Sequence, residues 1–309
     1  MDIFTGSPPP EFFKTGYPLA SLTRLRTGGT ARFFAKVNNL EDLEETLSFS
    51  KQNGLFFYIL GNGSNVLTDD NDFNGIVIIL GNGFNFISFD YNENKITAGA
   101  GTSLMKLGAR IAAHGHSGYT YMGVIPGTVG GAVAMNAGIN DTEKIHNHFS
   151  SALVLNPETL KAEKYSLKKM DFSYRKSAVK NSDKIIIKCS FILPDKKNVS
   201  RNEAKEKLKQ LLDLRREKQP KSSLTLGSTF KNPSDSIHSA GWLLEKTGMK
   251  KLKAGGAMVS NEHANWIINL GNATSNDVKA LIDTGQKRVF EEFGISLERE
   301  IIYLPEDRL

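Results

Sequence analysis

Residues 123–138 constrain the fold more than any other part of this chain, because they include five glycines, three alanines and no charged residue. Small residues at this density weaken a helix or a strand, so the segment must need a close approach of its backbone to something else. A flat, uncharged ring system lying against the main chain would meet that need.

Two shorter patches have the same character. The loop Gly61-Asn62-Gly63-Ser64-Asn65 follows an apolar run, and residues 98–101 read Ala-Gly-Ala-Gly. Glycines let the backbone approach a ligand closely, and successive N–H groups form a nest that binds anions. The loop matches neither the Gly-x-Gly-x-x-Gly fingerprint nor the Walker A motif, and taken alone it is compatible with a hairpin turn. Together the three patches predict a site for a nucleotide with a pyrophosphate and a flat tricyclic ring, and hence for FAD.

Hydrophobic periodicity and turn signals predict an α+β fold. We expect strands at residues 31–37, 56–60, 75–80 and 95–98, helices at 40–52 and 103–113, and strands of a mixed sheet between 153 and 193. The polar, turn-prone residues 194–198 mark a domain boundary.

Beyond that boundary, Ser200 and Glu203 have the spacing of a capping box, and Pro220 closes the helix that follows. We expect further helices at residues 239–247 and 276–293, and strands at 257–260, 266–269 and 296–304. The prediction is an FAD-binding domain at residues 1–197, with lobes at about 1–72 and 73–197, and a smaller α+β domain at 198–309.

The bulk composition is that of a globular chain of two or three lobes, with 309 residues, 39% hydrophobic and 23% charged. The one cysteine, Cys189, lies in an apolar stretch and is expected to be a buried strand thiol. The N-terminus lacks the regions of a signal peptide, and no apolar run approaches the ~20 residues of a membrane span. We therefore expect a soluble, cytoplasmic protein without a membrane partner.

Charge is distributed unevenly along the chain. The net charge is +6, but residues 161–253 carry 24 Lys and Arg against 10 Asp and Glu, a local balance of +14 that leaves −8 elsewhere. A basic middle indicates a polyanionic partner, such as nucleic acid, an anionic surface or a phosphorylated small molecule. A solvated lysine-rich face is the alternative.

A series of motifs extends from about Ser21 to Leu304 and gives the chain a family resemblance. The motifs are Thr27-Gly28-Gly29-Thr30-Ala31, Leu60-Gly61-Asn62-Gly63-Ser64-Asn65-Val66-Leu67, Ile125-Pro126-Gly127-Thr128-Val129-Gly130-Gly131-Ala132 with Met135-Asn136-Ala137-Gly138, Phe172-Ser173-Tyr174-Arg175-Lys176-Ser177, Lys218-Gln219-Pro220, Gly227-Ser228-Thr229-Phe230-Lys231-Asn232-Pro233, Ala257-Met258-Val259-Ser260 with His263-Ala264-Asn265, and Leu297-Glu298-Arg299-Glu300. In this order they are specific, and the sequence resembles the UDP-N-acetylenolpyruvoylglucosamine reductase family, in its shorter type without an inserted tyrosine-bearing loop.

The resemblance implies a two-lobed FAD-binding domain of the vanillyl-alcohol-oxidase type, followed by a substrate-binding α+β domain. It implies an oxidoreductase of peptidoglycan precursor synthesis, in which NADPH reduces FAD and the reduced flavin passes hydride to UDP-N-acetylglucosamine enolpyruvate, giving UDP-N-acetylmuramate. The implied partners are these small molecules alone, with no nucleic acid and no metal, and the chain is expected to be a monomer.

The same resemblance assigns the site residues. Arg175 matches the catalytic arginine, Ser228 the proton donor and Glu300 the second glutamate, although Glu298 falls on the same expected strand face by the two-residue period. The implied cofactor-binding residues are Gly61, Asn62, Gly63, Ser64, Asn65, Gly123, Ile125, Pro126, Gly127, Thr128, Gly130 and Gly131. The implied substrate-binding residues are Tyr174, Lys218, Lys231, Asn232 and His263, of which His263 can also be structural.

The sequence departs from the family pattern at Ile139-Asn140-Asp141-Thr142, where glycine and an acid are usual, and at Lys251, where glycine is usual.

Two other functions are compatible with parts of the pattern. An FAD-dependent oxidase of a sugar or small alcohol would share the fold but would not need the phosphate-binding lysines. A basic nucleic-acid-binding protein would instead show strongly salt-dependent affinity.

Overall fold

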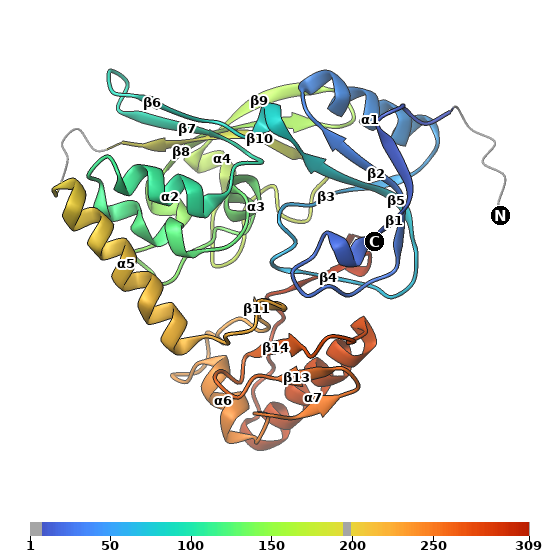
Figure 1. The fold of residues 1–309 in the computed structure, drawn as a ribbon, viewed down its shortest axis with the longest axis vertical. Coiled ribbons are helices and arrows are strands. Elements are labelled where there is room, and N and C mark those ends of the chain that lie inside the picture. Colours follow the sequence, from blue (N-terminus) through green and yellow to red (C-terminus); the bar gives the residue numbers. More distant parts are fainter. Residues whose placement is uncertain (1–7, 194–198, 309) are drawn as a thin grey trace. The chain divides into compact units, whose positions relative to one another are not determined.

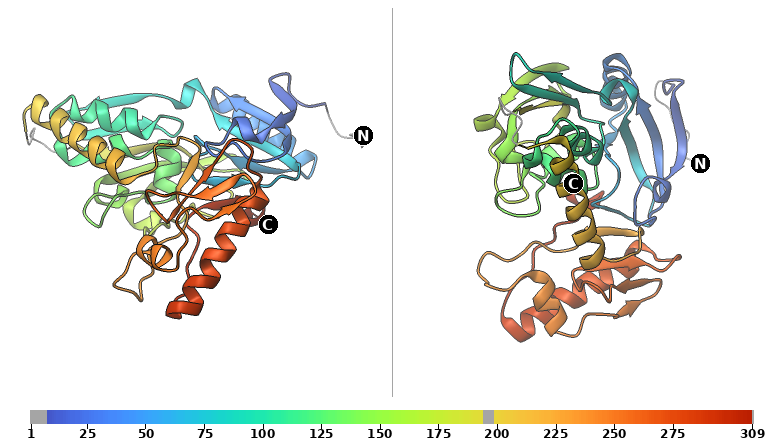
Figure 2. Two further views of the ribbon diagram at one scale, coloured as in Figure 1. Left: turned by 60° about the horizontal axis from the view of Figure 1, so that its bottom comes forward. Right: turned by 60° about the vertical axis from the view of Figure 1, so that its left-hand side comes forward.

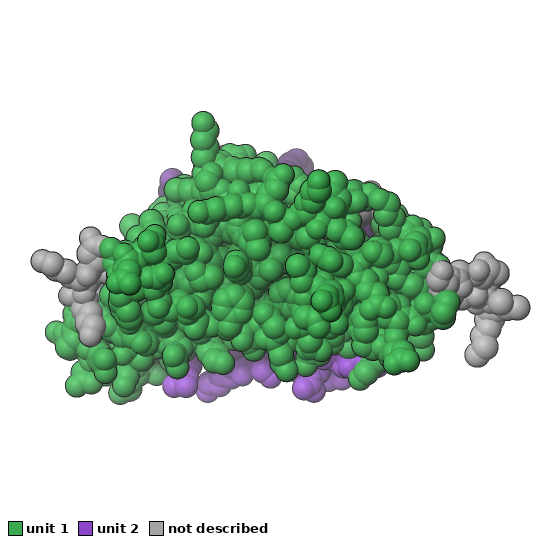
Figure 3. Space-filling model, turned by 90° about the horizontal axis from the view of Figure 1, so that it is seen from above, with its two compact units in different colours: residues 1–15, 33–61, 74–213 green, residues 16–32, 62–73, 214–309 purple. Residues whose placement is uncertain are grey.

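The computed structural model describes residues 8–193 and 199–308. Their Cα positions divide into two compact units, coloured separately in Figure 3. Unit 1 contains Met1–Thr15, Phe33–Gly61 and Asn74–Asp213, and unit 2 contains Gly16–Arg32, Asn62–Phe73 and Leu214–Leu309. Unit 2 therefore includes two N-terminal segments as well as the C-terminal part. The predicted linker at 194–198 lies outside the described residues, and the predicted domain boundaries remain predictions.

One sheet has the strand order β1-β2-β5-β3, with β3 and β5 parallel. Its strands are β1 (Phe13–Pro18), β2 (Thr30–Val37), β3 (Phe56–Ile59) and β5 (Phe73–Leu80). Helix α1 (Leu40–Gln52) begins as predicted, because Asn39 accepts a hydrogen bond from the Asp42 N–H at 2.8 Å. Leu43 and Leu47 of α1 pack with Ile76 and Ile78 of β5 in one apolar core.

The second sheet of unit 1 has the order β6-β7-β10-β8-β9. Its strands are β6 (Ile87–Asp90), β7 (Lys95–Gly99), β8 (Phe149–Asn156), β9 (Lys161–Ser166) and β10 (Ile185–Ile192), and the short helix α4 (Leu167–Met170) follows β9. Every neighbouring pair is antiparallel, so the prediction of a mixed sheet was wrong. A turn of four residues between β8 and β9 is too short for the crossover that parallel strands require.

Helices α2 (Leu104–Ala112) and α3 (Val129–Ala134) lie on one side of this sheet (Figure 1). They pack with the 3-10 helix η3 (Ser117–Val124) around the core that contains Cys189. Cys189 is fully buried in β10, which confirms the expected strand thiol, and burial raises the pKa of its thiol. The cysteine is therefore a packing residue.

Helix α5 (Arg201–Lys218) begins at the predicted capping box, since Ser200 and Glu203 exchange hydrogen bonds of 2.7 and 3.2 Å. Unit 2 then forms the antiparallel sheet β11-β14-β13-β12. Its strands are β11 (Thr225–Ser228), β12 (Lys253–Ala254), β13 (Ala257–Val259) and β14 (Trp266–Asn269). Helix α7 (Ser275–Phe293), the long red helix in Figure 2, packs with this sheet and with α6 (Ala240–Lys246) in one apolar core.

The last strand is shorter than predicted. Only β15 (Ile302–Leu304) is regular, and it pairs in parallel with β4 (Val66–Thr68). Before it, residues 296–301 contain one isolated antiparallel bridge, between Arg299 and Phe230, at which the Glu300 N–H donates to the Thr229 carbonyl at 2.8 Å. The hairpin alternative for residues 61–65 was also wrong, since β3 and β4 belong to different sheets.

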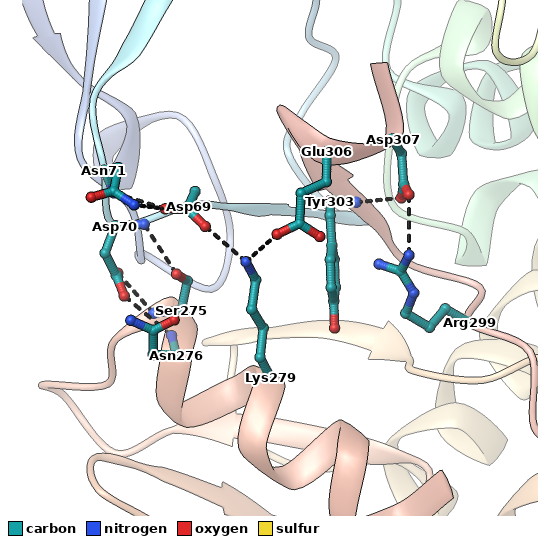
Figure 4. A network of polar contacts seen from close by, with 10 residues as sticks. All are labelled: Asp69, Asp70, Asn71, Ser275, Asn276, Lys279, Arg299, Tyr303, Glu306 and Asp307. Carbon is teal, nitrogen blue, oxygen red and sulfur yellow. Dashed lines mark hydrogen bonds and ion pairs between the residues drawn. The ribbon is translucent and has the colours of Figure 1, made fainter. Parts of the chain in front are cut away.

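Polar contacts hold β4 within unit 2 (Figure 4). The Lys279 ammonium of α7 donates to Asp69 at 2.7 Å and to Glu306 at 2.5 Å. The Asp70 carboxylate accepts from the Ser275 N–H at 2.8 Å and so caps α7. Among the described residues, none of the helices combines the length and the apolar character needed to cross a membrane.

Candidate active site

The Asn62–Asn65 part of the glycine loop belongs to unit 2 and contains a left-handed glycine, Gly63. Gly63 has φ +55°, and a Cβ there would lie 2.3 Å from the Leu22 carbonyl oxygen. Within the described residues, the N–H groups of Asn62 and Gly63 donate no hydrogen bond. A left-handed glycine whose own N–H and that of Asn62 are available fits the pyrophosphate of FAD.

Two buried hydroxyls support the same fit. The Oγ1 atoms of Thr23 and Thr27 have no hydrogen-bond partner among the described residues, whereas buried polar atoms are nearly always paired. A Cβ on Gly63 would lie 2.6 Å from the Thr23 Cα, so this orphaned hydroxyl belongs to a residue in direct contact with the loop. The loop and the adjacent Thr23 therefore offer N–H and hydroxyl groups that form no hydrogen bond within the described residues.

In unit 1, residues 125–131 form the turn before α3 and its first residues. Thr128 caps the helix by accepting from the Gly131 N–H at 3.3 Å, while the Gly130 N–H donates to the Ala100 carbonyl at 2.9 Å. Gly131 is exposed, and a Cβ there would meet only the Thr128 hydroxyl at 3.4 Å. Gly127 has φ +131°, which only glycine adopts readily. This surface is open enough for a flat ring.

Other glycines of this segment serve protein packing. A Cβ on Gly123 would lie 2.6 Å from the Leu208 side chain, and a Cβ on Gly108 would lie 2.2 Å from the Gly123 nitrogen. Gly130 packs on Ala100 in the same way, at 3.0 Å. The sequence analysis expected a flat ring system to lie close to this backbone. At Gly123 and Gly130, other residues of the protein lie that close instead. Contact of these two residues with FAD stays a prediction.

Arg175 lies in a tight turn of unit 1. Ser173 and Lys176 exchange backbone hydrogen bonds of 3.1 and 3.2 Å, and Arg175 between them has φ +55°. Its guanidinium Nη2 donates to the Gly138 carbonyl at 3.2 Å and lies beside the Tyr174 ring, with 5.1 Å from Cζ to the ring centre. An arginine in the left-handed region is uncommon and marks a position held by its surroundings.

Ser228 and Glu300 are brought together in unit 2. Ser228 ends β11 opposite Trp266, after Gly227 with φ +82° has shifted the register. The next residue, Thr229, accepts the Glu300 N–H, and the Glu300 carbonyl accepts from the Asn65 side-chain amide at 3.1 Å. The proton-donor candidate, the glutamate and the glycine loop are therefore one hydrogen-bonded piece.

The two glutamates near the end of the chain have different environments. Glu298 is exposed and forms an ion pair with the Lys231 ammonium, whereas Glu300 is half-buried. Residues 298–300 are not part of a regular strand, so the strand expected there was wrong, and the shared face of the two acids stays a prediction. The isolated bridge between Phe230 and Arg299 sets their positions instead.

The remaining substrate candidates differ in their surroundings. Tyr174 and Lys218 are exposed, and the Asn232 side chain accepts from the Ala240 N–H at 3.0 Å, at the start of α6. His263 packs on α6, since a Cβ on Gly241 would lie 2.7 Å from its ring. Burial, with a smaller contribution from Lys250, lowers the pKa of His263, so its ring is neutral near pH 7. Arg175 and Tyr174 lie in unit 1, and the other substrate candidates lie in unit 2.

Sequence reasoning missed two asparagines that position these residues. Asn265 is buried, and its side chain accepts from the Phe230 N–H at 2.9 Å and donates to the Phe230 carbonyl at 2.8 Å, two residues after Ser228. Asn136 makes similar contacts beside the Arg175 turn. Both belong to motifs of the family resemblance, which was the available signal, but pairing partners cannot be read from a motif.

Two family profiles match the chain. Residues 31–158 match an FAD binding domain, and residues 219–304 match the C-terminal domain of UDP-N-acetylenolpyruvoylglucosamine reductase. The two profiles confirm the α+β fold class, with an FAD-binding domain followed by a smaller domain. The site candidates Tyr174, Arg175 and Lys218 lie between the two matched ranges.

Relatives match over almost the full length. The UDP-N-acetylenolpyruvoylglucosamine reductase of Protochlamydia amoebophila is 39% identical over 96% of this chain and 96% of its own. That of Caldicellulosiruptor bescii is 38% identical over 96% of this chain and 91% of its own. The crystal structure of the enzyme from Thermus caldophilus superimposes with a TM-score of 0.77 and 32% identity, over 95% of this chain and 98% of that one. The chain belongs to the UDP-N-acetylenolpyruvoylglucosamine reductase family of FAD-dependent oxidoreductases.

Proposed function

We propose that this chain reduces UDP-N-acetylglucosamine enolpyruvate to UDP-N-acetylmuramate with Arg175, Ser228 and Glu300 as its catalytic residues. The chemistry that FAD would supply when bound is the transfer of a hydride from NADPH to the enolpyruvyl double bond. The residues proposed to hold FAD are Gly61–Asn65 and those at 123–131. The observation that carries the proposal is the hydrogen-bonded connection from Asn65 through Glu300 to the neighbour of Ser228.

The proposed role of Arg175 is electrostatic. Hydride arriving at the terminal carbon pushes negative charge onto the substrate carboxylate, and a fixed guanidinium stabilises that charge by a few kcal/mol, as preorganised donors typically do. Arg175 has an anchored backbone and a guanidinium tied at Nη2 to Gly138. Such anchoring is the preorganisation that the role requires.

Ser228 and Glu300 are proposed to take part in the protonation of the substrate. The carbon next to the carboxylate needs a proton from a positioned acid, and Ser228 is the proposed donor. The Glu300 carboxyl is proposed to help protonate or stabilise the enol. The chemical role is assigned to Glu300 on the family resemblance, whereas Glu298 forms an ion pair with Lys231.

Binding of the substrate is proposed to use charge. Lys218, Lys231 and Asn232 are proposed contacts for the diphosphate and carboxylate, with Tyr174 and His263 as further contacts. The local excess of basic residues supports this assignment. NADPH and the nucleotide are the proposed partners. We also propose that the protein is cytoplasmic and monomeric. Size-exclusion chromatography with light scattering tests the monomeric state.

The decisive experiment follows the two half-reactions separately. Purified protein should be yellow, anaerobic NADPH should bleach it, and the enolpyruvyl nucleotide should restore the colour. Ser228→Ala should keep the first half-reaction and slow the second by about 10²-fold or more, an effect in the usual range for general acids. If both half-reactions survive in that variant, Ser228 is not the proton donor. Oxygen-driven oxidation of a sugar without NADPH would favour the oxidase alternative.

A further inference from the structure

Asn136, one of the residues after α3, is buried and has an unusual backbone. Its exposed fraction is 4% and its φ is +43°. The side-chain Nδ2 donates to the Ser173 carbonyl at 2.8 Å, and Oδ1 accepts from the His146 N–H at 3.0 Å. Asparagine suits this position because it tolerates the left-handed region and offers both a donor and an acceptor.

The contacts of Asn136 lead directly to Arg175. Ser173 is the first residue of the turn that closes at Lys176, so the Asn136 amide binds the turn at its start. At the other end, the Ser177 hydroxyl donates to the Ala134 carbonyl at 2.7 Å. The Arg175 guanidinium itself donates to Gly138, two residues after Asn136. Residues 134–138 therefore hold the turn at three points.

We propose that Asn136 is a positioning residue for the reaction, which acts through Arg175 by fixing the turn 173–176 to the end of α3. The inference rests on the proposed role of Arg175. Asn136 ties the Arg175 turn to the segment that begins at Thr128. One rigid piece of unit 1 then carries both the proposed cofactor surface and Arg175.

The experiment is a double-mutant cycle on the reoxidation half-reaction. Asn136→Gly keeps the left-handed backbone free of strain and removes both side-chain hydrogen bonds. Asn136→Asp keeps the shape and the acceptor for His146 but removes the donor to Ser173. Each is combined with Arg175→Ala, and each FAD-loaded variant is reduced with NADPH before the enolpyruvyl nucleotide is added.

We expect Asn136→Gly and Asn136→Asp to slow reoxidation by roughly 10- to 100-fold, because misplacing a catalytic group by about 1 Å has effects of this size. Reduction by NADPH should change less than about threefold. In the Arg175→Ala background the same substitutions should add less than about a threefold loss, since residues that act as a unit are not additive.

Asn269 provides a matched control. It is buried to the same 4%, donates to the Leu25 carbonyl at 2.8 Å and accepts from the Gly271 N–H at 2.7 Å. It belongs to unit 2, however, whereas the Arg175 turn belongs to unit 1. Asn269→Ala should lower stability and leave reoxidation close to the wild-type rate.

The outcomes separate the two proposals. If Arg175→Ala reoxidises at the wild-type rate, the assigned role of Arg175 fails. Two results with a slow Arg175→Ala variant would overturn the inference. The first is an Asn136 variant that reoxidises as fast as wild type. The second is an Asn136 substitution that slows reoxidation in the Arg175→Ala background by the same factor as in wild type, since Asn136 would then not act through Arg175. Should Asn136→Gly not fold with FAD, the nearly isosteric Asn136→Asp decides.

Discussion

Arg175 in unit 1 lies in a four-residue turn with left-handed backbone, whereas Ser228 and Glu300 in unit 2 lie on extended segments that pair with each other. The first arrangement is held by side chains, among them Asn136 and Ser177. The second is held largely by backbone hydrogen bonds, with Asn265 alongside. Where the chain is too irregular for a ladder, a buried side-chain amide supplies the missing donor and acceptor in both units.

The difference lies in where strain is stored. Extended pairing is a low-energy conformation for Ser228, but a positive φ at Arg175 costs roughly 1–2 kcal/mol for a residue with a Cβ. We therefore expect unit 2 to respond to substitutions mainly through lost hydrogen bonds. Unit 1 should also respond through backbone conformation.

The largest effect should come from Asn265→Ala. The variant leaves the N–H and carbonyl of buried Phe230 without their partner. Each unsatisfied buried group costs about 1–3 kcal/mol, so the free energy of unfolding should fall by about 2–4 kcal/mol. Urea denaturation followed by circular dichroism measures it. A loss below about 1 kcal/mol would mean that backbone pairing alone holds Ser228.

Lys279→Ala should be next. Asp69 would lose the hydrogen bond that is the main cause of its lowered pKa, and Glu306 would lose the same partner. Hydrogen bonds to charged groups contribute about 1.5–3 kcal/mol, and partial exposure reduces this, so we expect a loss of about 1–2 kcal/mol. Lys287→Ala, which breaks an exposed pair with Glu291 at 3.9 Å, should change stability by under about 0.5 kcal/mol. If Lys279→Ala and Lys287→Ala lower the free energy of unfolding equally, the contacts of Lys279 in Figure 4 do not contribute to stability as expected.

Arg175→Gly should be more stable than Arg175→Ala by about 1 kcal/mol, although both lose the guanidinium, because only glycine accepts the positive φ without cost. Lys251 is a control outside the site. It has φ +64°, which accounts for the glycine usual at this position, and Lys251→Gly should be about 1 kcal/mol more stable than Lys251→Ala without slowing reoxidation. Thermal unfolding of the four variants tests both differences, and a gap at Lys251 alone would remove the strain argument at Arg175.

The smallest effect concerns pH. Burial lowers the pKa of His148, which lies against Tyr119 with ring centres 4.2 Å apart. The unfolded chain therefore binds a proton more readily than the folded chain, so this histidine destabilises the fold as the pH falls below about 6.5. His148→Phe should make stability less dependent on pH between 7 and 5, measured by urea midpoints. An unchanged slope would show that His148 does not contribute.

Most elements could be predicted from the sequence because they depend on local signals. Helix α1 and the capping box at Ser200 and Glu203 followed from periodicity and caps within a few residues. The isolated bridge of Arg299 with Phe230 before β15 could not be predicted, because the two residues are far apart in the sequence. The partners of β4 were missed for the same reason.

The candidate site shows the same division. The motifs of the sequence were sufficient to identify Arg175, Ser228 and Glu300 as candidates. The support of these residues could not be predicted, since the left-handed backbone of Arg175 and the amides of Asn136 and Asn265 depend on tertiary contacts. The packing of Gly123 could not be predicted either, because a Cβ there would lie 2.6 Å from the Leu208 side chain, while its contact with FAD stays a prediction.

The bond between Asn65 and Glu300 spans 235 residues, so its two ends are synthesised at different times. At about 5–20 residues per second, the glycine loop emerges roughly ten to fifty seconds before its partner exists. During that interval β4 has no β15 to pair with, and its edge is open to other chains. Slower translation of the intervening residues would lengthen the time for which this edge is open, and faster translation would shorten it.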